Sequence, residues 1–240
     1  MIAFDFDNTY ARDLDGFYVA WQGADFPDPK VVCLNAALAA SLGLDGDALN
    51  TSEGAEILSG KLAPAGATPL AMAYAGHQFG GFSPQLGDGR AMLLGELIDT
   101  SGNRVDLHLK GSGRTPFSRG GDGKAVLGPV LREYLMGEAM HALGVPTTRA
   151  LAAVTTGEQV AREGHKQGAV LARIAASHLR VGTFQFFAAR QEWARLRQLA
   201  DYAIARHYPE LSQAPDKYLA FLRAVADRQA ALVAKWLQIG

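Results

Sequence analysis

A lysine at the end of an alternating strand pattern, followed by a glutamate in an apolar helical pattern, could hold the phosphates of a nucleotide. Apolar and polar residues alternate in VDLHLK (105–110), which places Lys110 on the polar face of a predicted strand. Residues 126–143 are apolar nearly all round, as in a mostly buried helix, and include Glu133. A buried carboxylate needs a partner, because an unpaired buried charge is costly. We therefore expect a Lys110–Glu133 ion pair; the alternatives are a solvated Lys110, an exposed Glu133, or Glu138 as the buried carboxylate.

Two glycine-rich segments could bind an anion through their backbone N–H groups. They are GDGR at 87–90 and GGDGK at 120–124, and glycines let the backbone approach a phosphate closely. Either segment could instead be a plain turn. Neither is a Walker A loop, because the lysine of the second is followed by alanine, and no strict GxGxxG occurs. The second segment is basic, with Arg114, Arg119 and Lys124 in or near it, which favours an anion.

Two arginines lie on either side of a predicted strand-to-helix junction. Arg173 ends the last predicted strand, and Arg180 follows Ser177, the predicted helix cap. A guanidinium group binds phosphate oxygens through paired hydrogen bonds, so these two arginines could clamp a phosphate from both sides. The alternative is a pair of surface arginines.

Other catalytic patterns are incomplete in this sequence. Residues 5–9, DFDNT, match the DxDxT nucleophile loop of haloacid-dehalogenase phosphatases, but the preceding strand is very short and no βα repeat follows. A phosphatase of this type is therefore the least favoured of the functions that we consider. The six histidines lack metal-ligand spacing, the single cysteine, Cys33, offers no zinc site, and no GxSxG motif marks a serine nucleophile.

Composition and charge narrow the class of protein. At 240 residues the chain can form one large domain or two modest ones. A net charge of −1 gives no reason to expect binding to nucleic acid or to an anionic membrane. No apolar run reaches the ~18 residues of a membrane span, the acidic N-terminus is unlike a signal peptide, and one cysteine fits a reducing compartment. We expect a cytoplasmic protein.

The candidate residues need a scaffold that brings a glycine loop, a strand lysine and a helix glutamate together. Protein kinases hold nucleotide phosphates with parts in that order. We expect an α+β, protein-kinase-like fold, in which a mixed β/α N-lobe is followed by the first helices of a helical C-lobe. The predicted domains are an N-terminal extension (1–70), a nucleotide-binding N-lobe (71–176) and the incomplete start of a C-lobe (177–240). The patterns predict helices at 31–42, 53–60, 126–143, 183–207 and 216–239, a hairpin at 90–112, and strands at 149–155, 158–163 and 168–175.

The segment YAGHQFGGFSPQLGDGRAMLLGE, followed by LHLKGSGRTPFSRGGDGKAVLGPVLREYLMGEAMHALGVPTTRAL, closely resembles the selenoprotein O family, also called the YdiU family. The match begins near FDFDNTYAR and extends to the last predicted helix, so it covers essentially the whole chain. The resemblance implies a protein-kinase-like fold that transfers AMP from ATP to Ser, Thr or Tyr hydroxyls of proteins. It also implies an ATP that lies inverted relative to ordinary kinases, which exposes the α-phosphorus to attack.

The same resemblance implies an ATP site built from residues that local chemistry also indicates. Its nucleotide-binding positions would be Gly87, Gly89, Arg90, Lys110, Asp122, Gly123, Arg173 and Arg180. Glu133 would pair with Lys110, and the two arginines would enclose the γ-phosphate end of the inverted ATP.

In the family, the catalytic aspartate and the ligands for Mg²⁺ or Mn²⁺ follow the last helix seen here. We therefore expect no catalytic residue and no metal ligand within residues 1–240, and we expect the catalytic base beyond Gly240. The leading hypothesis is the nucleotide-binding half of a protein adenylyltransferase, which would be inactive on its own. The alternatives are a catalytically inactive ATP-binding pseudokinase module and, less favoured, an ordinary phosphoryl-transferring kinase. The sequence carries no signal for an oligomeric state.

Overall fold

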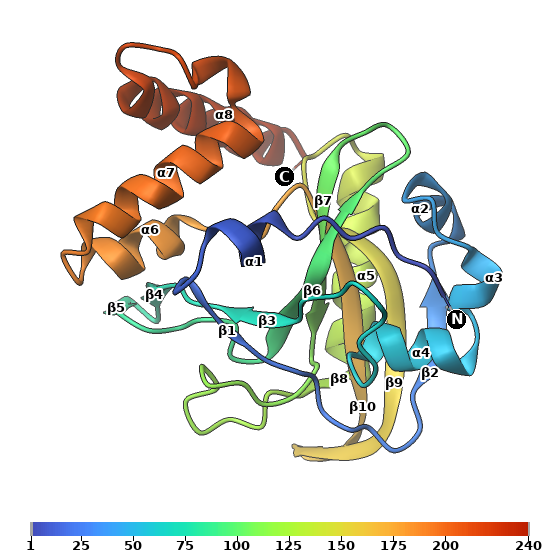
Figure 1. Cartoon of the computed structure of the whole chain (residues 1–240). Helices are drawn as coiled ribbons and strands as arrows, with labels where there is room; N and C mark the ends of the chain where they lie inside the picture. Colours follow the sequence, from blue (N-terminus) through green and yellow to red (C-terminus); the bar gives the residue numbers. More distant parts are fainter. Residues whose placement is uncertain (1, 240) are drawn as a thin grey trace.

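An antiparallel sheet forms the centre of the computed structural model, which describes residues 2–239 (Figure 1). Its central hairpin is the one expected at 90–112, with β6 (Ala91–Ile98) and β7 (Arg104–Lys110) paired along their length. The strands, in spatial order, are β1 (Tyr18–Ala20), β3 (Leu70–Met72), β6, β7, β10 (Gly164–Ala175), β9 (Arg149–Arg162) and β2 (Lys30–Leu34). The short β8 (Ala125–Val126) also pairs with β10, and β4 (Gly76–Gln78) and β5 (Gly81–Ser83) form a separate hairpin.

Helices cover both faces of the long strands β9 and β10. The helix α5 (Leu127–Ala142) packs on one face, and α4 (Ser52–Ser59) packs on the other (Figure 1). The remaining helices are α1 (Thr9–Asp13), α2 (Ala36–Ser41), α3 (Gly46–Leu49), α6 (Val181–Ala188), α7 (Trp193–His207), a 3₁₀ turn (Pro209–Leu211) and α8 (Lys217–Ile239). None of the helices between residues 2 and 239 is long and apolar enough to cross a membrane.

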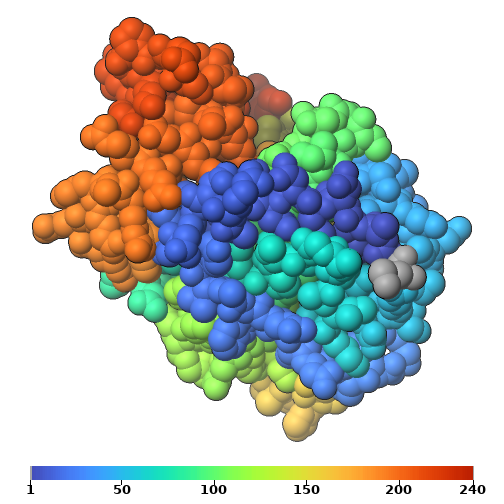
Figure 2. Space-filling model, viewed as in Figure 1, coloured from blue at the N-terminus to red at the C-terminus, as the bar shows by residue number. Residues whose placement is uncertain are grey.

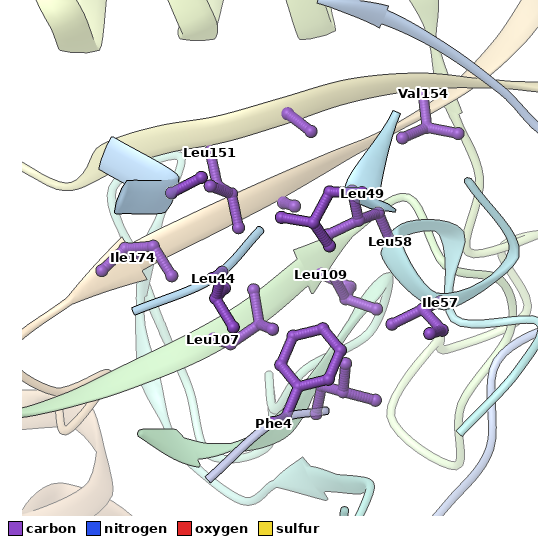
Figure 3. Packing of buried hydrophobic residues seen from close by; sticks show 14 of the residues in the cluster. Phe4, Leu44, Leu49, Ile57, Leu58, Leu107, Leu109, Leu151, Val154 and Ile174 are labelled. Atoms are coloured by element: carbon purple, nitrogen blue, oxygen red, sulfur yellow. The ribbon is translucent and has the colours of Figure 1, made fainter. Parts of the chain in front are cut away.

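The largest hydrophobic core lies between the sheet and the α2–α4 segment (Figure 3). Leu107 and Leu109 of β7 are fully buried here against Ile57 and Leu58 of α4. Burial of one such side chain contributes about 1.5–3 kcal/mol. Because side chains alternate along a strand, the same burial leaves the polar residues of β7 on the opposite face.

The C-terminal helices form a separate block that projects from the sheet (Figure 2). Phe187 of α6 and Leu199 of α7 are fully buried against an N-terminal cluster that includes Tyr10 and Phe17. By contrast, α8 has no buried residue, and Leu237 at its end is 80% exposed. The block is therefore attached mainly through α6 and α7, and Lys235 of α8 adds a hydrogen bond to the Gly144 carbonyl oxygen at 2.8 Å.

Tertiary pairing changes two expected elements. Residues 31–34, expected as the start of the helix at 31–42, belong to β2 because this segment pairs with β9. Asn35 then caps a shorter helix by accepting a hydrogen bond from the Leu38 N–H. The expected strands 149–155 and 158–163 are one strand, β9, which continues through Gly157 at φ +78° opposite a register shift.

Two expected helices also differ from the structure. The helix expected at 183–207 is two helices, because residues 189–192 turn the chain, with Gln191 at φ +58°. The apolar pattern at 126–143 predicts a mostly buried helix, but only Val130 of α5 is buried, and Leu135 and Met136 are 66% and 55% exposed. In this chain α5 covers the sheet with one face only.

Candidate functional site

The polar face of β7 carries the residues from which the site is built. Leu107 and Leu109 point into the main core, so Asp106, His108 and Lys110 lie on the other face. Strand β10 places Arg173 directly opposite His108 in the antiparallel ladder. The register of β10 against β9 shifts at Ala172/Arg173, and such an irregularity redirects a side chain.

Lys110, Glu133 and Arg173 form one charge cluster on this face. The Glu133 carboxylate, from α5, accepts a hydrogen bond from the Lys110 ammonium and another from Arg173 Nη1 at 3.1 Å. Burial alone would raise the pKa of Glu133, but Lys110 and Arg173 lower it. The expected Lys110–Glu133 ion pair is therefore confirmed, although Glu133 remains about a third exposed and serves two cations.

These cations line a pocket of about 570 Å³. Every residue expected to bind the nucleotide lines it, and those residues are Gly87, Gly89, Arg90, Lys110, Asp122, Gly123, Arg173 and Arg180. The structure thus brings together segments that are up to 93 residues apart in the sequence. Further cations line the same pocket, namely Arg119, Lys124 and Arg162. A pocket of this composition favours a polyanion.

The two glycine segments pack close to backbone at the pocket wall. Gly123 has φ +69°, and a side chain there would overlap the Gly113 carbonyl. A Cβ on Gly89 would lie 2.7 Å from the backbone oxygen of Phe117. Glycine is therefore required at both positions, for conformation at the first and for space at the second.

The carboxylates that line the pocket are both engaged. Asp122 accepts hydrogen bonds from Arg162 Nη1 and Nη2 at 2.8 and 3.0 Å, and Arg162 chiefly lowers its pKa. Asp88 is buried and accepts from the Met72 N–H at 3.1 Å and from His108 at 3.2 Å. Burial would raise the pKa of Asp88, but His108, the Met72 N–H and Arg180 lower it to about 2.

Among residues 2–239, no three His, Cys, Asp or Glu side chains are grouped so that they could hold a metal ion. With Asp88 and Asp122 already paired, the donors around the pocket do not fit a metal cage supplied by this segment. The catalytic base is expected beyond Gly240, and Gly240 itself lies outside the residues that the structure describes. The position of the base therefore stays a prediction.

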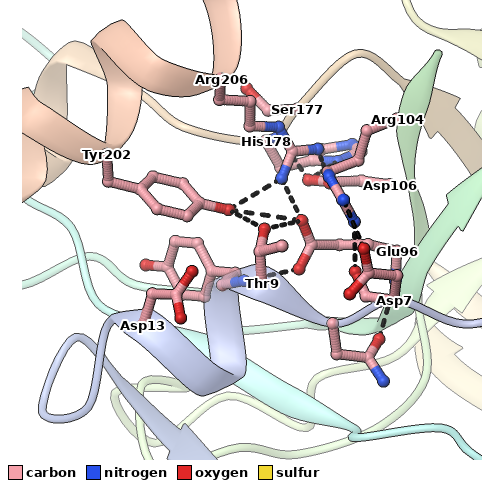
Figure 4. Close-up of polar contacts among 12 residues, drawn as sticks. Asp7, Thr9, Asp13, Glu96, Arg104, Asp106, Ser177, His178, Tyr202 and Arg206 are labelled. Atoms are coloured by element: carbon pink, nitrogen blue, oxygen red, sulfur yellow. Dashed lines mark hydrogen bonds and ion pairs between the residues drawn. The ribbon is translucent and has the colours of Figure 1, made fainter.

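A second polar cluster joins the sheet to α7 and to the N-terminal segment (Figure 4). Arg206 of α7 binds the Glu96 carboxylate, and its Nη2 lies 2.5 Å from Asp106 Oδ1. All three side chains are at most 5% exposed. Glu96 also accepts a hydrogen bond from the Thr9 hydroxyl at 2.8 Å, and Asp106 accepts from the backbone N–H of His178 at 2.6 Å.

The DFDNT segment belongs to this cluster. Asp7 pairs with Arg104 and with Arg12, and Asn8 Oδ1 accepts from the Glu96 N–H at 2.9 Å. Asp7 and Asn8 thus attach the N-terminal segment to the sheet.

A larger pocket, of about 950 Å³, lies among α6, α7 and α8. Its walls are mainly apolar and include Phe184, Trp193 and Phe221. Arg180, Arg197 and Arg228 also line it, but the smaller pocket has more cations and all the glycine-segment residues expected to bind a nucleotide, so we place the candidate site there.

Comparison with known proteins shows the family of the chain. The family model described as "Protein adenylyltransferase SelO" matches residues 1–240. The chain belongs to this family. Proteins named "Protein nucleotidyltransferase YdiU" are similar to it: one from Cereibacter sphaeroides (strain ATCC 17025) is 69% identical over 240 residues, and one from Rhizobium meliloti (strain 1021) is 62% identical over 240 residues. Both alignments cover 100% of this chain, but 50% and 49% of the relatives, so the chain spans about half their length.

In this member of the SelO family, the site also contains residues that the sequence did not predict to take part in binding. These residues are uncharged, or they are hydrogen-bonded to other residues of the protein. Tyr74 and Gln78 line the pocket. His108 is hydrogen-bonded to Arg173 on one side and to Asp88 on the other. Only His108 had a sequence signal, since it shares the polar face of the strand with Lys110. Tyr74 lies beneath Arg180, whose guanidinium carbon is 4.9 Å from the ring centroid, and burial chiefly raises the pKa of Tyr74 to about 12.

Proposed function

We propose that this chain is the nucleotide-binding half of a protein adenylyltransferase that moves AMP from ATP onto Ser, Thr or Tyr hydroxyls of proteins. The observation that carries the proposal is the cationic pocket, in which all eight expected nucleotide-binding residues meet. Membership of the SelO family and the names of the relatives support the same reaction class. We further propose that the segment acts as the N-lobe and the start of the C-lobe of a protein-kinase-like fold.

The proposed contribution of this half is positioning and charge neutralisation. Lys110 and Arg173 share the Glu133 carboxylate, so their cationic groups are held in place before a ligand arrives. Together with Arg180 they would offset the charge of a triphosphate, while backbone N–H groups of the glycine segments approach its oxygens. Charge that builds up during phosphorus–oxygen bond cleavage would be stabilised by groups already oriented toward it.

A general base must come from elsewhere in this proposal. Asp88 and Asp122, the carboxylates that line the pocket, are both hydrogen-bonded to cations or donors. We therefore propose that the 240-residue chain binds ATP without transferring AMP, and that Mg²⁺ or Mn²⁺ is bound by groups outside residues 2–239. We derive no step through such a metal.

A second candidate is a nucleotide-binding module without catalysis. The engagement of both lining carboxylates is the observation that favours it. The ordinary kinase reaction is the third candidate, and it differs in which phosphorus is attacked.

A chimaera separates these candidates. This chain would replace the matching half of the Cereibacter sphaeroides relative, to which it is 69% identical. The chimaera is then incubated with ATP labelled at the α- or the γ-phosphate. We expect α-label on protein hydroxyls, lost in Lys110→Ala. Transfer of γ-label instead would establish the kinase reaction, and ATP binding with neither label transferred would establish the non-catalytic module.

A further inference from the structure

A buried histidine lies directly behind the pocket cations. His108 is fully buried on β7, two residues before Lys110 and opposite Arg173 of β10. Its Nδ1 lies 2.8 Å from Arg173 Nη2, and its Nε2 lies 3.2 Å from Asp88 Oδ2. Neither the nucleotide-binding pattern nor the family match assigns it a role.

These contacts determine the tautomer of His108. A guanidinium group only donates hydrogen bonds, so Nδ1 must be the unprotonated, accepting nitrogen. A carboxylate only accepts, so Nε2 carries the hydrogen that is donated to Asp88. The ring is therefore neutral. Burial above all, with the neighbouring His178 and the Arg173 charge, lowers the pKa of His108 to about 3, although Asp88 acts in the opposite direction.

The neutral ring holds one branch of the Arg173 fork. Glu133 holds the other branch through Nη1, so the guanidinium is fixed from two sides. A guanidinium has five N–H donors, and Arg173 Nε is buried with no partner among the described residues. Nε is too deeply buried to meet a ligand directly, but each Nη nitrogen carries a second N–H, and a phosphate oxygen in the cationic pocket is a suitable acceptor for these donors.

The ring itself is held by its neighbours. His178 stacks on it with ring centroids 4.1 Å apart and an interplanar angle of 13°. His178 in turn donates from Nδ1 to Asp106 at 3.3 Å, and Asp106 binds Arg206 of α7. On the other side, Asp88 is the second residue of the first glycine segment. One ring thus connects the glycine loop, Arg173 and the cluster at α7.

We propose that His108 is a positioning residue: with Asp88 behind it, it holds Arg173 in the orientation that binds a phosphate of the nucleotide. This inference rests on the proposed function, because it presumes a phosphate ligand in the pocket. The role requires an acceptor at the Nδ1 position, and a buried side chain of similar size without one cannot supply it.

Three substitutions separate this role from simple packing. In His108→Asn the amide oxygen can take the place of Nδ1 and accept from Arg173. In His108→Gln the longer amide reaches the place of Nε2 and donates to Asp88, while His108→Leu does neither. The exposed His165 of β10 provides the control His165→Leu. Affinities for ATP and for adenosine are measured by isothermal titration calorimetry on the 240-residue chain, with each variant's fold checked by circular dichroism.

We expect His108→Leu and His108→Gln to weaken ATP binding by about tenfold or more, the loss of one charge-assisted hydrogen bond, with little change for adenosine. His108→Asn should stay closer to the wild type, and His165→Leu should match it. Unchanged ATP affinity in His108→Leu would overturn the inference. So would ATP binding that is retained in His108→Gln but lost in His108→Asn. Failure of the wild type to bind ATP would instead refute the proposed function.

A second readout needs neither a ligand nor a substitution. In ¹⁵N NMR of the histidine side chains, His108 should give an unprotonated Nδ1 and a protonated Nε2 at neutral pH. The opposite tautomer or a doubly protonated ring would overturn the proposed hydrogen bond to Arg173, even if the substituted chains do not fold.

Discussion

Arg206 is the residue whose removal should most damage the attachment of α7 to the sheet. Its side chain is 5% exposed, and it is the cation that binds both Glu96 and Asp106, which are 0% and 3% exposed. The substitution Arg206→Met keeps an unbranched chain but leaves two buried carboxylates without the cation that they share. Removing one partner of a buried ion pair costs about 3–5 kcal/mol. Since small proteins have only about 5–15 kcal/mol of stability, the variant should be close to unfolding.

Urea denaturation followed by circular dichroism measures this loss. The control is Arg12→Met, because Arg12 pairs with Asp7 at the surface with 60% of its side chain exposed, and such exposed pairs contribute little to the free energy of unfolding. Adding Glu96→Gln to Arg206→Met should restore part of the stability, because it removes one of the unpaired charges. An Arg206→Met cost below about 1 kcal/mol, or strict additivity in the double variant, would refute the reasoning.

Two further predictions concern the glycine segment and acid sensitivity. Gly123→Ala should destabilise the chain by about 2 kcal/mol or more and weaken ATP binding, because φ is +69° and a Cβ meets the Gly113 carbonyl. The control is Gly128→Ala, in α5 with open space around it, which should stabilise the folded chain by up to about 1 kcal/mol. If urea titrations give the two variants equal free energies of unfolding, the backbone strain at position 123 is contradicted. The pKa of His108 is about 3 against an ordinary 6.5, so below pH 6.5 the unfolded chain takes up a proton that the folded chain does not. From pH 7 to 5.5 this group alone should remove about 1 kcal/mol of the free energy of unfolding, and His108→Asn should flatten that dependence. An unchanged slope would count against the neutral buried ring.

The sequence predicted those parts of the site that depend on the residue pattern of a single strand or helix. The alternation at 105–110 predicted both the strand and the side on which Lys110 lies, because polar residues of a half-buried strand share one face. The helix that carries Glu133 followed from its apolar content and its stop at Gly144, and the ion pair followed from the cost of an unpaired carboxylate.

Features that depend on distant pairing could not be predicted in the same way. Residues 30–34 have a composition that suits a helix or a strand, and only the β9 edge decides in favour of a strand. The role of Asp88 depends on a histidine 20 residues away, and a lone Asp between two glycines is typical of a turn. The exposure of Leu135 and Met136 depends on which face of α5 meets the sheet, and an all-apolar helix pattern gives no preferred face.

Binding of ATP to the cationic pocket is the central claim, and calorimetric titration of the 240-residue chain with ATP tests it most directly. Lys110→Ala should weaken binding by about tenfold or more, because a charge-assisted hydrogen bond to phosphate is lost. Lys166→Ala, which removes an exposed lysine on β10, should leave the affinity unchanged. Equal affinities for the wild type and Lys110→Ala, or no binding by the folded wild type, would contradict the account.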